Sequence, residues 1–383
     1  MSTRLKVAIV GCGKIADAHA MQIQRIAGCE IVGVCDREPL MAKQLCERFR
    51  AGVYFSQPEE LLDRVQPDVV HVTTPPASHF ELARLCLNRG CNVYVEKPFT
   101  LNADEALDLI QLAESRRCKI TVGHNDQFSH VARRLRKLVS DGYLGDSIIH
   151  MESHYGYDLG DAAYARALLG DKGHWVRKLP GKLLQNVISH GVARIAEFLT
   201  GDNLQIMTHC FTSPLLKGIG ENEIADELRV VISEASRTTA YFTFSSQVRP
   251  SVHEFRIYGS KNGLILDQDH DILLKLRGKK YKSFADKFIP PLQFARQHLD
   301  AAFSNMRLFL ARDFHTDSGM KYLFEAFYES IRQNTPVPIT YREILLTARI
   351  MDAIFEQMNV GCRELTMHPV EAGRQIAPES LAG

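Results

Sequence analysis

The stretch VAIVGCGKIADAHA, residues 7–20, carries the clearest structural signal in the first part of the chain. A β-branched run leads into Gly11-x-Gly13-x-x-Ala16, and a helical pattern follows it. The first glycine allows a tight turn, the second lets backbone amides approach a bound group, and the alanine allows close packing of helix on strand. The start of the helix favours negative charge. The stretch therefore predicts a strand–loop–helix unit that binds a pyrophosphate, although small residues also suit any tight turn between a strand and a helix.

An acidic residue stands where such a loop would need one. The next expected strand, Glu30–Cys35, is followed by Asp36, which lies 20 residues after Ala16. A carboxylate at this place accepts hydrogen bonds from a ribose diol and repels a 2′-phosphate, so NAD is favoured over NADP. Arg37 comes directly afterwards and could soften that preference. The alternative is a structural unit of the same fold without a ligand.

Apolar runs alternate with amphipathic stretches over the first ~120 residues, which indicates a doubly wound parallel α/β sheet. The expected strands are Leu5–Val10, Glu30–Cys35, Val69–Val72, Asn92–Val95 and Ile120–Val122, and the expected helices include Leu40–Phe49, Phe80–Asn88 and Ala103–Ser115.

The pattern changes after Gly123, and mostly strands are expected between 204 and 276, with helices near 129–140 and 184–199. Consecutive hairpins predict a largely antiparallel sheet. We therefore expect a Rossmann domain over 1–123 and an α+β domain over 124–383.

Composition narrows the possible classes of protein. The chain has 383 residues, of which 45% are apolar and 24% charged, and a net charge of +1. These values predict two globular domains, and the charge is not basic enough to indicate binding of nucleic acid. The nine cysteines form no zinc or disulfide pattern, so we expect no metal site and reduced thiols in a cytoplasmic protein. The early first strand leaves no room for a signal peptide, and no run is long enough to span a membrane.

Two further segments end strands at the same expected edge of the sheet. HVTTPPASH (71–79) follows one strand, and NVYVEKPFT (92–100) contains the next. Open α/β sheets bind ligands beyond the carboxyl ends of their strands, so Thr74 and Pro75 would lie beside a nicotinamide arm. A rigid turn before a helix explains the first segment equally well, and a solvated loop would explain Glu96-Lys97-Pro98 in isolation.

These motifs, in this order and spacing, resemble the glucose–fructose oxidoreductase / inositol dehydrogenase (Gfo/Idh/MocA) family. GHNDQF (123–128), the strand pattern 147–157 and the stretch with His190 extend the resemblance over most of the chain. The resemblance implies a Rossmann domain followed by an open-faced sheet. It also implies an NAD(P)-dependent enzyme that forms a homodimer or homotetramer and acts on a sugar-type or cyclitol substrate. It places the cofactor at Gly11, Gly13, Lys14, Ile15, Ala16, Asp36, Arg37, Thr74, Pro75, His79 and Glu96.

The resemblance also implies the catalytic residues. Lys97 is expected to reach the substrate hydroxyl, where a fixed ammonium stabilises an alkoxide. His190 is expected to accept the hydroxyl proton, and Asn186, one helical turn earlier, stands where the family usually has an acid. Further substrate contacts are expected from Asn125, Tyr155 and Trp175. Because Asn186 carries no charge, the sequence predicts no carboxylate beside His190.

Residues 287–314 form a basic amphipathic stretch within an insertion near 280–315. A subunit interface, a lid or ordinary core is expected there before a peripheral membrane contact. The chain is thus expected to be an NAD-dependent dehydrogenase acting on a CH–OH group of a sugar, nucleotide sugar or cyclitol. An NAD-dependent glycoside hydrolase on the same fold, or a non-catalytic NAD- or sugar-binding regulator, remains the alternative.

Overall fold

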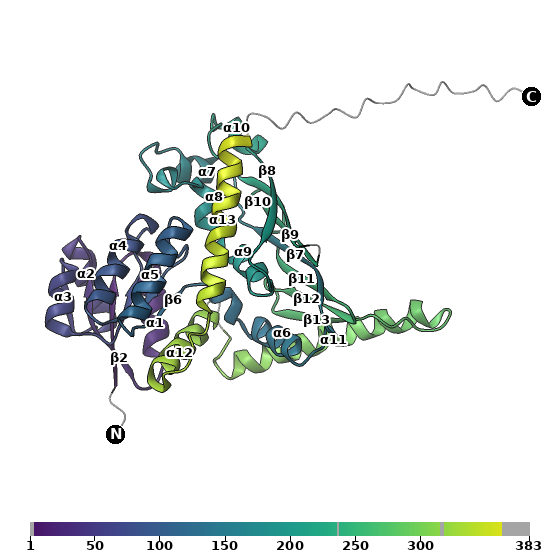
Figure 1. Ribbon diagram of the computed structural model, residues 1–383, viewed down its shortest axis with the longest axis horizontal. Coiled ribbons are helices and arrows are strands. Elements are labelled where there is room, and N and C mark those ends of the chain that lie inside the picture. The colour runs from purple at the N-terminus through teal and green to yellow at the C-terminus, as the bar shows by residue number, and fades with distance from the viewer. Residues whose placement is uncertain (1–3, 236, 315–317, 362–383) are drawn as a thin grey trace, which may run out of the picture.

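The computed structural model describes residues 4–235, 237–314 and 318–361. Two sheets lie side by side, and the helix nearest the C-terminus runs between them (Figure 1). The first sheet has six parallel strands in the order β3-β2-β1-β4-β5-β6. The second has seven strands in the order β13-β12-β11-β7-β10-β9-β8, and only β7 and β10 pair in parallel. This confirms the expected parallel sheet and the expected largely antiparallel one.

The N-terminal part alternates strands and helices, as its sequence pattern predicts. Its elements are β1 (Leu5–Val10), α1 (Lys14–Gln24), β2 (Cys29–Cys35), α2 (Pro39–Phe49), β3 (Val53–Phe55), α3 (Pro58–Val65), β4 (Val69–Val72), η1 (Pro76–Ser78), α4 (His79–Asn88), β5 (Asn92–Val95), α5 (Ala103–Ser115) and β6 (Ile120–Val122).

The remaining elements follow β6. They are η2 (Asn125–Phe128), α6 (His130–Ser140), β7 (Ile148–Gly156), α7 (Ala162–Leu169), η3 (Trp175–Lys178), α8 (Lys182–Val187), α9 (Ser189–Ala196), β8 (Leu204–Phe211), α10 (Pro214–Gly218), β9 (Glu227–Glu234), β10 (Thr238–Ser245), β11 (His253–Gly259), β12 (Asn262–Asp267), β13 (Ile272–Arg277), α11 (Ala285–Leu310), α12 (Ser318–Gln333) and α13 (Tyr341–Gly361).

Local signals explain several helix boundaries. The side chain of Asn102 accepts a hydrogen bond of 2.8 Å from the backbone amide of Glu105 and so caps α5. Pro39 and Pro58 open α2 and α3, where their missing N–H groups would have no partner in the helix. The short strand β3 was not expected from the sequence, because two of its three residues are exposed and it carries no alternation.

The predicted helix 184–199 is instead two short helices. Helix α8 ends at Val187 and α9 begins at Ser189, with Ile188 between them. Every residue of α9 is buried, because the helix is packed between β7 and α13. The predicted pair Asn186 and His190 therefore lies on two helices.

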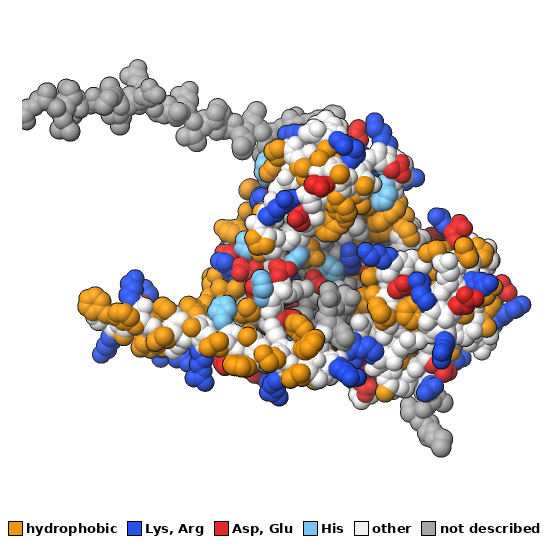
Figure 2. Space-filling view, turned by 180° about the vertical axis from the view of Figure 1, so that it is seen from behind, with side chains coloured by type: hydrophobic (Ala, Val, Ile, Leu, Met, Phe, Trp, Pro, Cys, Tyr) orange, Lys and Arg blue, Asp and Glu red, His pale blue; other side chains and the backbone are white. Residues whose placement is uncertain are grey.

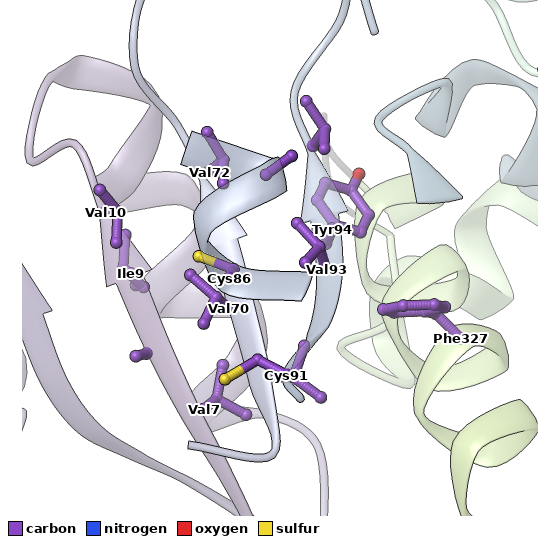
Figure 3. Packing of buried hydrophobic residues seen from close by; sticks show 14 of the residues in the cluster. Val7, Ile9, Val10, Val70, Val72, Cys86, Cys91, Val93, Tyr94 and Phe327 are labelled. Carbon is purple, nitrogen blue, oxygen red and sulfur yellow. The ribbon is translucent and has the colours of Figure 1, made fainter. Parts of the chain in front are cut away.

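The C-terminal segment returns to the first sheet. Helix α12 contributes Met320, Leu323, Phe324, Phe327 and Tyr328 to the core of the N-terminal sheet. Figure 3 shows Phe327 next to Tyr94 of β5, and their ring centroids are 6.4 Å apart. The N-terminal core thus also uses residues beyond the predicted boundary at residue 123.

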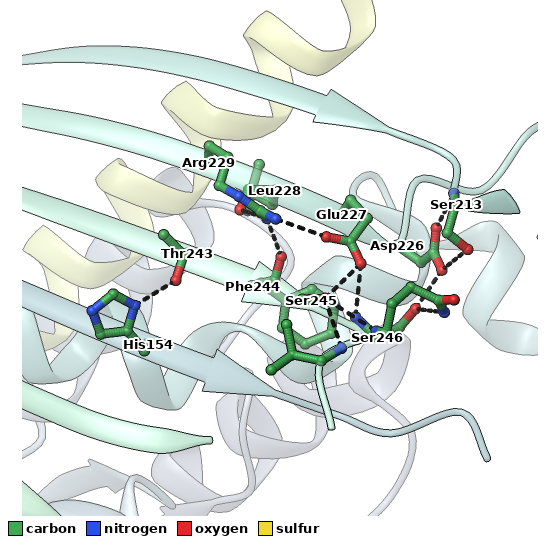
Figure 4. A network of polar contacts seen from close by, with 12 residues as sticks. His154, Ser213, Asp226, Glu227, Leu228, Arg229, Thr243, Phe244, Ser245 and Ser246 are labelled. Carbon is green, nitrogen blue, oxygen red and sulfur yellow. Dashed lines mark hydrogen bonds and ion pairs between the residues drawn. The ribbon is translucent and has the colours of Figure 1, made fainter. Parts of the chain in front are cut away.

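Buried carboxylates tie the end of the second sheet together (Figure 4). Asp226 accepts hydrogen bonds of 2.6 Å from both the amide and the hydroxyl of Ser213, and Ser246 donates to the same carboxylate. Glu227 accepts from the hydroxyl of Ser245 and from Arg229. These bonds satisfy polar groups that burial would otherwise leave unpaired. Within the described ranges, no helix has the length and apolar character needed to cross a membrane.

Candidate functional site

The loop between β1 and α1 has the shape that the glycine pattern predicts. Gly11 has a φ of +99°, and a Cβ added there would lie 2.7 Å from Cγ2 of Thr74. Gly13 is different, because an added Cβ would have no protein atom within 4 Å. The packing of the chain therefore requires Gly11 but not Gly13. The open space above Gly13, beside the unpaired amides at the start of α1, fits a pyrophosphate.

Asp36 lies at the end of β2 and faces this loop. Its Oδ2 accepts a 2.7 Å hydrogen bond from the amide of Cys12, and its Oδ1 accepts a 2.9 Å bond from the amide of Glu38. Each carboxylate oxygen has a second lone pair that could accept a ribose hydroxyl. Arg37, Lys14 and Ile15 are exposed around the same loop.

The strand-end segments after β4 and β5 are tied together by His79. Its Nε2 lies 2.8 Å from the carbonyl oxygen of Thr74, and its Nδ1 lies 2.9 Å from that of Pro98. His79 is fully buried, and burial lowers its pKa. Both ring nitrogens face backbone carbonyls, so neither is free for a cofactor, and His79 holds these two loops in place. Thr74 is half-buried and Pro75 is exposed at the sheet edge.

Glu96 ends a chain of four buried side chains. Nε2 of His19 lies 2.8 Å from Oε1 of Glu96, and Nδ1 of His19 lies 2.9 Å from Nδ1 of His71. Nε2 of His71 in turn lies 2.8 Å from the hydroxyl of Tyr328 on α12. Burial raises the pKa of Glu96, but the bond from His19 and the nearby Lys97 outweigh it and hold the pKa below its usual value.

When Glu96 is ionised and His19 carries one ring proton, the direction of every hydrogen bond in this chain is fixed. His19 donates from Nε2 to Glu96, so its Nδ1 must accept from Nδ1 of His71. Burial holds the pKa of His71 well below the usual value, so the ring is neutral and its Nε2 accepts from Tyr328. His19 and His71 lie within the quoted stretches 7–20 and 71–79, but the sequence did not single them out, because they come into contact only when the sheet forms.

Lys97 reaches across to the second domain. Its Nζ donates a 2.9 Å hydrogen bond to the backbone carbonyl of Asn186 in α8. Burial lowers the pKa of Lys97, whereas Glu96 and Asp126 act in the opposite direction. One donor of the ammonium is used by this bond, and two more are left for a substrate oxygen.

His190 has a carboxylate neighbour that the sequence analysis did not expect. Its Nδ1 lies 3.7 Å from Oδ2 of Asp126, which comes from η2. Burial lowers the pKa of His190, Asp126 opposes the change and Lys97 adds to it. The prediction that no acid stands beside His190 is therefore wrong. Asp126 lies within the quoted GHNDQF segment, but only the packing of η2 against α9 brings it to the histidine.

A small recess is lined by Asp126, His190, Tyr155, Arg194 and His253. The ring of Tyr155 stacks on that of His190 with centroids 6.4 Å apart, and it meets His253 edge-on at 4.4 Å. Nη2 of Arg194 donates to the carbonyl of Asp126 at 2.9 Å and to Gln268 at 2.8 Å. The predicted substrate residue Tyr155 thus lies beside the predicted base, together with an arginine that the sequence reasoning did not select.

Two other predicted substrate residues do not line this recess. Trp175 begins η3 and packs against the core of the second domain, with His174 as its aromatic neighbour at 5.5 Å. Asn125 opens η2 and is half-buried one residue before Asp126. His124, directly before it, is buried, and neither of its ring nitrogens has a hydrogen-bond partner in the described part of the chain. Its ring lies 5.8 Å from that of His190.

The protein thus combines a nucleotide-binding Rossmann domain with a second domain that has a mixed sheet. The second domain faces the ligand-binding edge of the first. The sequence model of the oxidoreductase family with an NAD-binding Rossmann fold (GFO_IDH_MocA) matches residues 5–124. This match assigns residues 5–124 to the NAD-binding Rossmann fold of that oxidoreductase family.

Individual relatives agree with this assignment. D-glucoside 3-dehydrogenase of Escherichia coli is 32% identical over 38% of this chain and 42% of its own length. Glycosyl hydrolase family 109 protein 4 of Phocaeicola vulgatus is 24% identical over 74% of this chain and 56% of its own length. The chain thus spans about half the length of these curated relatives.

A solved structure matches over nearly the whole fold. The WlbA dehydrogenase of Bordetella pertussis, solved with NADH and UDP-GlcNAcA, superposes with a TM-score of 0.74 at 16% identity and covers 94% of this chain and 97% of its own. This likeness concerns the fold.

Proposed function

We propose that the protein is an NAD-dependent dehydrogenase that oxidises a hydroxyl group of a sugar, nucleotide sugar or cyclitol. The observation that carries the proposal is the meeting of Lys97, His190 and Asp126 where the ligand edge of the first sheet faces the second domain. A cation, a neutral base and a carboxylate behind that base are the groups that removal of a hydroxyl proton requires.

Bound NAD⁺ would accept the hydride from the hydroxyl-bearing carbon. His190 takes the hydroxyl proton, because its lowered pKa leaves the imidazole neutral at pH 7. Asp126 stabilises the imidazolium that results, since its carboxylate lies 3.7 Å from Nδ1. Lys97 donates to the substrate oxygen and stabilises its developing negative charge.

The preference for NAD over NADP is part of the proposal. Asp36 is held toward the loop by two backbone amides, and its negative charge would oppose a 2′-phosphate. The seven cysteines between residues 12 and 118 form no disulfide bond, which supports the proposal of a reducing, cytoplasmic setting. A homodimeric or homotetrameric assembly is proposed on the resemblance alone.

The substrate class rests on the relatives that act on or bind sugars and nucleotide sugars. A second candidate function is an NAD-dependent glycoside hydrolase, which the relative from Phocaeicola vulgatus favours. The two functions differ in their net redox balance, because a hydrolase of this kind regenerates its cofactor within each cycle.

The test is a panel of free sugars, nucleotide sugars, cyclitols and nitrophenyl glycosides, each incubated with the protein and NAD⁺. Net NADH formation on a sugar would support the dehydrogenase, and nitrophenol release without net NADH would support the hydrolase. Tight NADH binding without either reaction would favour a regulator and contradict both enzymes.

A further inference from the structure

Helix α11 exposes an apolar face that the rest of the described chain leaves uncovered. Six large side chains on it, each between 56% and 74% exposed, recur at intervals of three, four or seven residues: Phe288, Leu292, Leu299, Phe303, Met306 and Leu310. At about 100° per residue they fall within an arc of roughly 60° on one side of the helix. We call these six residues the apolar stripe.

The opposite side of α11 is fixed to the edge of the second sheet. The side chain of Gln297 accepts a 2.7 Å hydrogen bond from the amide of Lys275 in β13, and it donates to the carbonyl of the same residue. Asn305 donates to the carbonyl of His270 at 2.9 Å. These bonds protect an edge strand and set the rotation of the helix, so the apolar stripe points outward.

Part of the helix projects from the body of the molecule. Figure 1 shows α11 projecting beyond β13, and Figure 2 shows orange side chains along the projecting arm with blue ones beside them. The projecting part of the helix therefore carries both apolar and basic side chains on its surface.

Positive charge is concentrated around the stripe. Residues 279–312 contain seven Lys and Arg against two Asp, a net charge of +5 in a chain whose total is +1. Arg296 and Arg307 flank the stripe on one side, and Lys287 lies beyond its other side. This combination of an apolar arc and basic flanks is typical of helices that lie in the interface of an anionic bilayer.

Charge also argues against a second copy of the chain as the occupant. Two copies packed stripe to stripe would bring the arginine flanks of both helices together. One of the two acidic residues of the segment, Asp300, is already paired with Arg296 at 3.8 Å. An anionic partner neutralises these charges, whereas an identical helix repeats them.

We propose that α11 docks this protein onto the surface of a membrane containing anionic lipid, with the apolar stripe in the headgroup boundary and the arginines among the phosphates. The proposed docking would place the protein at a membrane surface, and it does not depend on the proposed enzymatic activity.

The test uses the full-length protein and flotation with phosphatidylcholine vesicles, with and without phosphatidylglycerol. The protein should float with the anionic vesicles at low salt and be released at high salt. The double substitution Leu299→Gln and Phe303→Gln should lower the partition coefficient at least ~10-fold, because it removes two exposed apolar side chains from the contact. Leu40→Gln on α2 is the matched control, since Leu40 is 65% exposed, and it should float like the unaltered protein.

A second pair of variants tests the charge. Arg296→Gln should lower the partition coefficient about fivefold, the equivalent of about 1 kcal/mol per basic residue near an anionic surface. Arg64→Gln removes an arginine in a similar pair with Glu60 on α3 and should have no effect. Absence of flotation at low salt would overturn the proposal, as would equal flotation of the Leu299→Gln and Phe303→Gln protein. A molar mass that falls to that of the single chain in this variant would also overturn it, because the stripe would then join two copies.

Discussion

Nε2 of His19 lies 2.8 Å from Oε1 of Glu96, and both residues are buried where the first sheet meets α12. This contact joins the glycine-loop helix to the strand end that carries Lys97. It also makes the charge of Glu96 depend on residues from three other elements, because His71 and Tyr328 continue the chain.

Replacing His19 by phenylalanine tests this contact. The variant keeps an aromatic ring but leaves the buried carboxylate without its donor, so we expect a loss of ~1–3 kcal/mol in the free energy of unfolding at pH 7. In the native protein the depressed pKa of Glu96 contributes stability above the unfolded value near pH ~4.3, and this contribution is lost as the pH falls. The difference between the two proteins in urea unfolding should therefore shrink below that pH. A gap that is the same at pH 7 and at low pH would show that Glu96 is not the group involved.

The two loop glycines should respond differently to substitution. Gly13→Ala should leave the unfolding temperature unchanged and weaken NADH binding at least ~10-fold, because only a ligand needs the space above it. Gly11→Ala should destabilise the fold by ~2 kcal/mol or more, since its positive φ and the contact with Thr74 both oppose a side chain. Calorimetry and NADH fluorescence distinguish the two effects. Unchanged NADH affinity in a folded Gly13→Ala protein would remove the loop from the cofactor site.

Lys97→Met keeps the apolar stem and removes the charge. Turnover on an accepted sugar should fall at least ~10²-fold, the scale of losing one oxyanion-type donor, whereas NADH affinity should change little. Lys119→Met is the matched control, because Lys119, directly before β6, also donates from Nζ to backbone carbonyls, those of Ser330 and Thr335. Equal losses in both variants would mean that Lys97 acts by joining the domains.

The pH profile of oxidation reports on His190. A base whose pKa is lowered by burial is neutral at pH 7, so kcat/KM should be near its plateau there, with an acidic limb below pH ~6.5. Asp126→Asn removes a charge that raises this pKa, so the limb should move to lower pH while the plateau rate falls. Asn186→Asp should move the limb upward, and His190→Ala should abolish it together with most of the rate. A limb that survives His190→Ala would assign the proton to another group.

Asp36→Ser tests the cofactor preference. NAD should bind more weakly and NADP relatively better, because the charge that opposes a 2′-phosphate is gone. Asp68→Ser is a useful control, since Asp68 also accepts a 2.7 Å bond from a backbone amide, that of Lys6, but in a loop between α3 and β4 at the other end of the sheet. The ratio of the dissociation constants for NAD and NADP should change only in the Asp36→Ser variant. An unchanged ratio there would show that Asp36 does not set the cofactor preference.

The local parts of the fold could be predicted and the tertiary parts could not. The bounds of β1 and the cap at Asn102 follow from nearby residues, and the structure confirms both. Asp126 was missed because it reaches His190 only when η2 packs on α9, two elements separated by more than fifty residues. The break at Ile188 was missed for a similar reason, since the apolar pattern on both sides of it is helical.

Helix α12 has a consequence for the synthesis of this protein. The first sheet is complete at Val122, but the helix that covers Tyr94 and His71 begins about 200 residues later. The Rossmann domain therefore leaves the ribosome with one side of its core exposed to water. That side is covered only after α12 has been synthesised. A nascent chain stopped after β6 should bind chaperones or aggregate, and proteolytic resistance of the N-terminal half should arise only when α12 has been made.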